Sequence, residues 1–328
     1  MKAALIGCGK ISRVHLAALD AMADVTLAAV ADCVPVRAKA AAEAHGCRAY
    51  TDYLELLDTE HPDVVHICTP HFLHVEMACE ALKRGVSVLC EKPCAITAES
   101  LRRLREAQRE SGLVCGVCFQ NRYNAGAVLA KRLLAEGTYG KLLAAAAHVL
   151  WSRDAQYYSD GWHGKKATEG GGVLVNQAVH TIDLLRWLIG ADMEDCTVHL
   201  ANDSLQGVIE VEDTALVRMR YQNGVTAQLD ATVAFTRNAK VQLDLFCEKG
   251  TLRLEGAELY FLAPDGQIEK LTGAVRNATV GKDYWGGGHP ALLGDFYVCV
   301  REGRPFAIDF FEGGKATEDF LRMYAAAQ

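Results

Sequence analysis

The sequence has no long hydrophobic run, no excess of positive charge and no internal repeat or low-complexity linker. No uninterrupted apolar stretch approaches the ~18 residues that a membrane-spanning helix needs. The amino-terminal MKAALIGCGK predicts a strand and a turn, and it lacks the pattern of a signal peptide. The net charge of −7 disfavours a nucleic-acid-binding surface. These absences predict a cytoplasmic protein that binds neither membranes nor nucleic acids.

The sequence also lacks groups of His, Asp and Glu residues at the spacings of metal ligands. Many of its twelve cysteines lie in apolar, strand-like runs, where free cysteine behaves as a small hydrophobe. Cys115 and Cys118 form a CxxC pattern, but residues three apart in a strand point to opposite faces of the sheet. We therefore expect no metal site and no redox-active cysteine pair.

The 328 residues are half hydrophobic and long enough for two domains. Residues 1–119 alternate strand and helix patterns, which predicts an α/β domain with a doubly wound, parallel sheet of six strands. In residues 120–328 strand patterns dominate, and Asn223-Gly224 between two of them is typical of a hairpin. We expect this second domain to be α+β, with an open, mostly antiparallel sheet and one main helix.

A glycine-rich turn follows the first predicted strand and reads GCGKIS at residues 7–12. It opens a helix and precedes an acid, Asp32, at the end of the next strand, which is the context of a dinucleotide-binding motif. Gly7 permits a tight turn, Gly9 lets the backbone approach a pyrophosphate, and Asp32 suits a ribose hydroxyl of NAD better than the 2′-phosphate of NADP. The expected cofactor contacts are Gly7, Gly9, Lys10, Ile11 and Asp32. The alternative is a glycine turn without a ligand.

Residues 170–190, GGGVLVNQAVHTIDLLRWLIG, predict one helix with a close-packed entrance and a glycine stop. One apolar stripe recurs at spacings of three and four residues: Leu174, Ala178, Ile182, Leu185 and Ile189. A second stripe is polar or aromatic and consists of Asn176, His180, Asp183 and Trp187. This stripe fits either a lined pocket or a buried histidine bonded to its neighbours.

Three motifs together resemble one known family. They are GCGKISRVH at the start, Glu91-Lys92-Pro93 after the fifth predicted strand, and GGGVLVNQAVHTIDLL in the second domain. The chain resembles the glucose–fructose oxidoreductase, inositol dehydrogenase and rhizopine-catabolism family, Gfo/Idh/MocA, over nearly its whole length. Residues 69–74 and 284–289 are similar to two further segments of that family. The resemblance implies hydride exchange between a nicotinamide cofactor and a ring carbon of a carbohydrate or cyclitol.

The carboxyl ends of parallel strands should bring Thr69-Pro70 and Glu91-Lys92-Pro93 to the nicotinamide crevice. The resemblance adds His74 to the expected cofactor contacts, and it implies a cis peptide bond between Lys92 and Pro93. An oxidised nicotinamide beside Lys92 would lower the pKa of its ammonium group and suit it to proton transfer. The alternative for Lys92 is an ordinary surface lysine.

The resemblance implies that His180 touches the substrate hydroxyl, where an imidazole can act as a base. Many relatives have an aspartate where this chain has Asn176, and asparagine can orient a hydroxyl but cannot accept its proton. The proton therefore falls to His180 or Lys92, and the choice between them stays open. We expect Asp183 to support His180, and we expect substrate contacts from Lys92, Arg122, Trp162, His163, Asn176 and His180. Tyr157 and Tyr158 fit either a substrate site or domain packing.

The sequence thus predicts an NAD-dependent dehydrogenase of a sugar, glycoside or cyclitol. Two alternatives are a redox-neutral enzyme that keeps its NAD and a catalytically silent NAD-binding protein. The open sheet of the second domain predicts a homo-oligomer, a dimer or a tetramer, because such a face or edge usually needs a partner.

Overall fold

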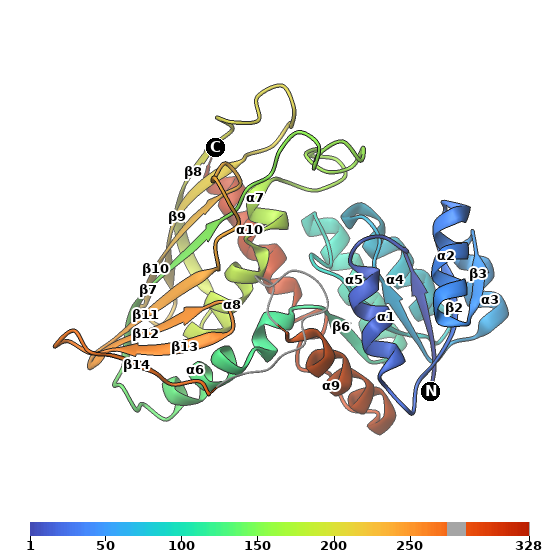
Figure 1. The fold of residues 1–328 in the computed structure, drawn as a ribbon, viewed down its shortest axis with the longest axis horizontal. Helices are drawn as coiled ribbons and strands as arrows, with labels where there is room; N and C mark the ends of the chain where they lie inside the picture. Colours follow the sequence, from blue (N-terminus) through green and yellow to red (C-terminus); the bar gives the residue numbers. More distant parts are fainter. Residues whose placement is uncertain (274–286, 328) are drawn as a thin grey trace. The chain divides into compact units, whose positions relative to one another are not determined.

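The computed structural model describes residues 1–273 and 287–327, which form two compact units (Figure 1). The first unit comprises Met1–Phe119 and His289–Thr317, and the second comprises Gln120–Gly288 and Glu318–Gln328. The division after Phe119 agrees with the sequence-based prediction. Residues 289–317, which we expected in the second domain, instead group with the first unit. None of the helices in the described ranges has the length and apolar character that a membrane span requires.

The first unit contains a six-stranded sheet in which every pair of neighbours is parallel. The strand order, β3-β2-β1-β4-β5-β6, is the doubly wound order that places ligands at the carboxyl ends of the strands. The predicted Rossmann-type fold is therefore confirmed. The strands are β1 (Lys2–Ile6), β2 (Thr26–Ala31), β3 (Arg48–Tyr50), β4 (Val64–Ile67), β5 (Ser87–Cys90) and β6 (Cys115–Val117).

Capping residues mark the ends of helices in this unit. Helix α5 starts after Thr97, whose hydroxyl accepts the Ser100 N–H in a capping box, and it stops at Gly112 in the left-handed region. The helices are α1 (Ser12–Asp20), α2 (Pro35–His45), α3 (Tyr53–Glu60), α4 (His74–Lys83), α5 (Ala98–Ser111) and α9 (His289–Glu302), with a short 3₁₀ helix, η1 (His71–Leu73).

Residues 289–317 pack against the last strand of the first unit, in the space that Gly116 leaves by having no side chain. A Cβ added at Gly116 of β6 would lie 2.9 Å from ring atoms of both Phe296 and Phe306. The neighbouring Val117 donates its N–H to the Ile308 carbonyl at 2.8 Å. Since these partners are nearly two hundred residues apart in the chain, sequence patterns did not predict the association.

The second unit contains an eight-stranded mixed sheet in the order β14-β13-β12-β11-β7-β10-β9-β8. Only the β7–β10 pairing is parallel among the strand pairs of the described residues, so the predicted open, mostly antiparallel sheet is confirmed. The strands are β7 (Leu142–Leu150), β8 (Met193–Ala201), β9 (Thr214–Tyr221), β10 (Thr226–Thr232), β11 (Gln242–Cys247), β12 (Gly250–Glu255), β13 (Glu258–Leu262) and β14 (Ile268–Lys270).

Several helices cover one face of this sheet, so the expectation of one main helix was wrong (Figure 1). They are α6 (Ala125–Ala135), α7 (Val173–Asn176) and α8 (Val179–Ile189), and a 3₁₀ helix, η2 (Gln120–Tyr123), precedes α6. Burial alternates along β9 and β10, which shows that their other face is not covered by the unit's own core. Helix α10 (Gly314–Ala326) begins in the first unit and continues into the second.

The helix predicted over residues 170–190 is interrupted between α7 and α8. Ala178 donates its N–H to the carbonyl of Val173, five residues back, at 2.8 Å, which is the hydrogen-bond spacing of a π-bulge. The entrance is close-packed, as expected: a Cβ on Gly172 would lie 1.9 Å from the Glu212 carbonyl oxygen. The Glu212 carboxylate accepts the N–H groups of Gly172 and Leu174 at 3.1 Å and so holds the start of α7.

Asp319 is a buried acid in the part of α10 that groups with the second unit. Burial raises the pKa of Asp319 to about 7, although Arg186 of α8 and Arg322 act in the opposite direction. A carboxyl group whose pKa is raised on folding binds its proton more tightly in the folded state. Its stabilising contribution is therefore complete below the unfolded pKa and is lost as the pH rises through about 7.

We predict that Asp319→Asn will be more stable than the wild type at pH 8 by on the order of 2–4 kcal/mol, and that the difference will shrink towards pH 4. Urea unfolding followed by tryptophan fluorescence measures this, since all four tryptophans fall within the residues of the second unit. Glu318→Gln removes the same charge from the exposed neighbouring position and is the control. Parallel pH profiles for wild type and Asp319→Asn would contradict the prediction.

Candidate active site

The predicted pyrophosphate turn has the shape that the motif requires. Gly7 adopts a φ of 94°, and a Cβ there would lie 2.7 Å from the backbone of Cys68. A Cβ on Gly9 would meet nothing within 4 Å, which leaves space for a ligand against this backbone. Ser12, in place of the usual third glycine, donates its hydroxyl to the Gly9 carbonyl at 2.7 Å and thereby closes the turn. The two glycines therefore differ in role, one sterically required and one bordering open space.

Asp32 and the start of α1 complete this side of the site. The Asp32 carboxylate accepts the N–H groups of Cys8 and Val34, each at 2.8 Å. A carboxylate has about four acceptor positions, so these bonds leave capacity for ribose hydroxyls. Helix α1 has no side-chain cap at Ile11, and its first N–H groups suit an anion; Lys10 beside it is exposed. The residues present thus fit a dinucleotide.

His74 has a different role from the one predicted. Its side chain is fully buried, with Nε2 2.8 Å from the Thr69 carbonyl and Nδ1 2.7 Å from the Pro93 carbonyl. Both ring nitrogens of His74 lie against backbone carbonyls, so neither is available for a hydrogen bond to the cofactor. The expected cofactor contact is therefore replaced by an indirect role. His74 ties the loop after β4, with its half-buried Thr69-Pro70, to the loop after β5.

The loop after β5 presents Lys92 and turns Glu91 inward. Lys92 is half-buried, and its peptide bond to Pro93 is cis, as the resemblance implied. Glu91 is only 5% exposed, and its Oε1 lies 2.9 Å from Nε2 of His15. The expected contact between the Glu91 carboxylate and the cofactor is therefore corrected, because the carboxylate is bonded within the core.

Glu91, His15 and Cys118 bring three potential metal-ligand atoms within 4.8 Å of one another. Burial raises the pKa of the Cys118 thiol well above its ordinary value, and the Glu91 charge adds to this. A thiol in this environment keeps its proton, whereas metal ligation requires the thiolate. The Glu91 carboxylate is also matched by the His15 ring. We therefore interpret the group as a hydrogen-bonded cluster rather than a metal centre.

In the second unit, the polar stripe marks the accessible side of α7 and α8. Every residue from 171 to 186 is buried except Asn176 and His180, which are half-buried. The apolar stripe is fully buried up to Leu185, and Ile189 is 7% exposed. Within this segment, Asn176 and His180 of the predicted stripe are therefore partly accessible, whereas Asp183 is buried.

Asn176 is held by a buried glutamate that sequence reasoning did not select. Its Nδ2 donates to Oε1 of Glu169 at 2.5 Å and to the hydroxyl of Tyr157 at 3.2 Å. Glu169 is 1% exposed and also accepts the Gly164 N–H. Burial, together with the Glu169 charge, raises the pKa of Tyr157 to about 12, so its hydroxyl stays protonated. The signal in the sequence was an acid directly before GGG, on a loop that also carries Lys165 and Lys166.

The predicted substrate residues Trp162 and His163 belong to the same loop network. The Tyr157 hydroxyl lies 3.3 Å from Nε2 of His163, and Nδ1 of that ring is 2.6 Å from Asp160 Oδ2. The rings of Trp162 and His163 lie 3.7 Å apart between centroids. Tyr157, whose two interpretations were open, thus connects Asn176 to His163, while Tyr158 is buried.

Arg122 and Asp183 form a buried ion pair. Nε and a terminal nitrogen of Arg122 donate to the two carboxylate oxygens of Asp183 at 2.7 and 2.5 Å, and the side chains are 5% and 1% exposed. This bidentate pair connects η2 to α8. Asp183 is therefore bonded to Arg122, and its support of His180 stays a prediction. A substrate contact by Arg122 stays a prediction.

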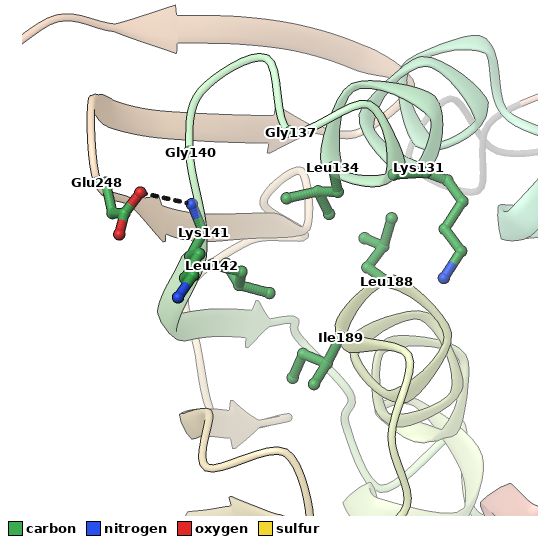
Figure 2. A pocket seen from close by; sticks show the side chains of 10 residues that line it. Lys131, Leu134, Gly137, Gly140, Lys141, Leu142, Leu188, Ile189 and Glu248 are labelled. Carbon is green, nitrogen blue, oxygen red and sulfur yellow. Dashed lines mark hydrogen bonds between the residues drawn. The ribbon is translucent and has the colours of Figure 1, made fainter.

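A cavity of about 440 Å³ lies at the far end of α8 from these residues (Figure 2). Leu188 and Ile189 of α8, Leu134 of α6 and Leu142 of β7 form its apolar walls, and Glu248 accepts the Lys141 N–H at its rim. None of the predicted catalytic or binding residues lines it. Of the segment at 284–289 that resembled the family, residues 284–286 lie outside the described residues.

Comparison with known proteins agrees with both halves of this description. Residues 1–119 match the family model "Oxidoreductase family, NAD-binding Rossmann fold", and residues 128–253 match the GFO/IDH/MocA C-terminal domain. Inositol 2-dehydrogenase 2 of Saccharopolyspora erythraea is 31% identical over 258 residues, which cover 77% of this chain and 73% of that protein.

Two solved structures are similar over the whole chain. The WlbA dehydrogenase of Chromobacterium violaceum, in complex with NADH and UDP-GlcNAcA, has 31% identity and a TM-score of 0.87, covering 100% of this chain and 93% of that one. A levoglucosan dehydrogenase, in complex with NADH and levoglucosan, shares the fold with a TM-score of 0.90 at 23% identity, covering 100% and 97%. The chain belongs to the Gfo/Idh/MocA family of oxidoreductases, with an NAD-binding Rossmann domain followed by the carboxyl-terminal domain of that family.

Proposed function

We propose that this protein is an NAD-dependent dehydrogenase that oxidises a ring hydroxyl of a sugar, glycoside or cyclitol. The observation that carries the proposal is the half-buried pair Asn176 and His180 on an otherwise buried helical segment. An imidazole and an amide at adjacent turns suit a hydroxyl group, which needs one proton acceptor and one orienting partner. The relatives support the substrate class, because they include an inositol dehydrogenase and a structure with a bound nucleotide sugar.

The cofactor, held by the Gly7–Ser12 turn and Asp32, supplies the hydride acceptor when it is bound. The chain supplies the proton chemistry. His180 or Lys92 accepts the proton of the hydroxyl group, and Asn176, fixed by Glu169 and Tyr157, orients that group. Named relatives are dehydrogenases, which favours net turnover over a redox-neutral reaction. The twelve cysteines, all within the described residues, form no disulfide bond, which supports a cytosolic location as part of this proposal.

Absorbance at 340 nm, with NAD and a panel of inositols, hexoses, glycosides, uronates and nucleotide sugars, tests the proposal directly. Continuous accumulation of NADH with one substrate class is the expected result. A rise that stops near one equivalent per protein would indicate a retained, recycling cofactor. No rise with any member of the panel would contradict the proposed function.

Lys92→Ala should lower kcat by about 10²–10⁴-fold, because a positioned proton-transfer group contributes a factor of that size. Titration with NAD, followed by tryptophan or NADH fluorescence, should give a Kd within about threefold of the wild type. Lys83→Ala, an exposed lysine of α4 paired with Glu80, is the matched control and should keep full activity. Unchanged turnover in Lys92→Ala would remove Lys92 from the mechanism.

The two glycines of the turn should separate folding from cofactor binding. Gly7→Ala combines a positive φ with a backbone contact at 2.7 Å, so it should lose about 2 kcal/mol or more of stability. Gly9→Ala projects into open space and should fold normally while weakening NAD binding at least tenfold. Calorimetric melting and NAD titration of both variants measure this, and equal NAD affinity for Gly9→Ala and wild type would be the contrary result.

We also propose that the protein is a homo-oligomer and that a second copy covers the outer face of the eight-stranded sheet. Leu216 and Phe246 on that face are 49% and 38% exposed, and Phe246 lies opposite the small side chain of Ala144. Sedimentation equilibrium should give a dimer or tetramer. The double variant Leu216→Lys, Phe246→Lys should dissociate, whereas Val36→Lys, which alters an exposed residue of α2, should not. A monomeric wild type would refute this part.

A further inference from the structure

A buried chain of hydrogen bonds in the first unit leads from α9 to the residue before Lys92. The Tyr297 hydroxyl is 2.9 Å from Nε2 of His66, Nδ1 of His66 is 2.9 Å from Nδ1 of His15, and Nε2 of His15 is 2.9 Å from Oε1 of Glu91. The four side chains come from α9, β4, α1 and the end of β5, and none is more than 5% exposed. Four separate elements therefore converge on one carboxylate.

The partners determine the direction of these hydrogen bonds. The His15 ring holds the pKa of Glu91 well below its usual range, although burial is the largest influence and acts the opposite way. An ionised carboxylate only accepts, so Nε2 of His15 donates. With a neutral His15, its Nδ1 accepts from His66, and Nε2 of His66 accepts from the Tyr297 hydroxyl. A His15 ring with hydrogen on both nitrogens would reverse the His15–His66 and His66–Tyr297 bonds, and the Tyr297 oxygen, which can donate or accept, serves either direction.

The series of hydrogen bonds ends at the carboxylate of Glu91, the residue before Lys92. Oε2 of Glu91 accepts the backbone N–H of Lys92 at 3.2 Å, and the Lys92 charge contributes to the lowered pKa of Glu91. Electrostatic coupling is mutual, so an ionised Glu91 favours the protonated ammonium of Lys92. If His15 could not donate, burial would favour a neutral Glu91 and the ammonium would lose its neighbouring anion.

Of the other titratable groups of the described residues, Asp63 acts on Tyr297, and burial shifts the histidines and thiols around the cluster towards their neutral forms. Burial lowers the pKa of His66, His74 and His289, the last to about 4, and raises the pKa values of the thiols beside Glu91 well above the ordinary range. These thiols are Cys68, Cys90 and Cys118. The charged groups that act on the cluster therefore include Glu91 itself, Lys92 and Asp63.

We propose that Tyr297, His66 and His15 are positioning residues that keep Glu91 ionised behind Lys92 and thereby set the proton affinity of Lys92. The proposal rests on the proposed function in assigning Lys92 to proton transfer. In this role Tyr297, His66 and His15 make no contact with the substrate. They act on the reaction through the charge of Glu91 alone.

The direct test measures the proton affinity of Lys92 in the protein without cofactor. Competitive acylation with acetic anhydride between pH 7 and 11, quantified by mass spectrometry of the peptide that contains Lys92, gives its pKa. His15→Leu, which removes the donor, should lower the Lys92 pKa by about one to two units. His15→Gln, which restores an N–H donor, should recover most of this shift. Tyr297→Phe should give a smaller decrease of about half a unit.

A double-variant cycle separates this role from general disturbance of packing. Glu91→Gln should reproduce the full decrease, and adding Tyr297→Phe or His15→Leu to it should cause no further change, because the anion through which they act is gone. Cys118→Ala alters a side chain 4.0 Å from the same His15 nitrogen and should leave the Lys92 pKa unchanged. The limb of the kcat–pH profile that depends on Lys92 should move by the same amounts.

An unchanged Lys92 pKa in His15→Leu and Tyr297→Phe would overturn the proposal, as would additive shifts in the Glu91→Gln background. If His15→Leu fails to fold, Tyr297→Phe, which removes a single oxygen, decides the question. The labelling result does not depend on turnover. Activity retained by Lys92→Ala would therefore remove Lys92 from the proposed mechanism, whereas an unshifted Lys92 pKa with inactive Lys92→Ala would refute this inference alone.

Discussion

A carboxylate that leaves water must be matched by hydrogen-bond donors, and both units of this protein are arranged around such matches. In the first unit the match is between Glu91 and His15 at the end of β5. In the second unit Glu169 accepts from Asn176 and Gly164, and Glu212 accepts from the start of α7. Each buried acid fixes the backbone or side chain next to a residue assigned to the reaction. Because the acids are withdrawn from the surface, they orient the site without competing for the substrate.

The same kind of match holds the side chain of Asn176 in place. The amide of Asn176 cannot take a proton, but its Nδ2 bonds to Glu169 and Tyr157 fix the side chain. The carboxylate lies behind the amide, on Glu169, a residue that is 1% exposed and accepts the Asn176 hydrogen bond. In the proposed reaction, proton acceptance therefore falls to His180 or Lys92. The loop that carries Tyr157, Trp162 and His163 is joined to the same network, so substrate selection and hydroxyl orientation depend on one set of contacts.

Much of the fold was predictable because its signals are local. Strand and helix alternation predicted the six parallel strands, and Asn223-Gly224 predicted the turn between β9 and β10. Strand β8 was missed, since its outward positions are polar, its burial does not alternate cleanly, and its register shifts near Met193. The association of residues 289–317 with the first unit was also missed. It depends on Gly116 of β6, because two phenylalanines from a distant segment occupy the space that a larger side chain would take.

The sequence by itself determined the residues whose role follows from their own chemistry and their nearest neighbours. Gly7 needs a positive φ, Gly9 borders open space, and Asn176 and His180 share a helical face, and all of these follow from spacing over a few residues. Only the tertiary structure decided the roles of His74, Arg122, Glu91 and Glu169. Each of these polar side chains could face a ligand or the core, and its partner, which determines the choice, is brought to it by the packing of separate elements.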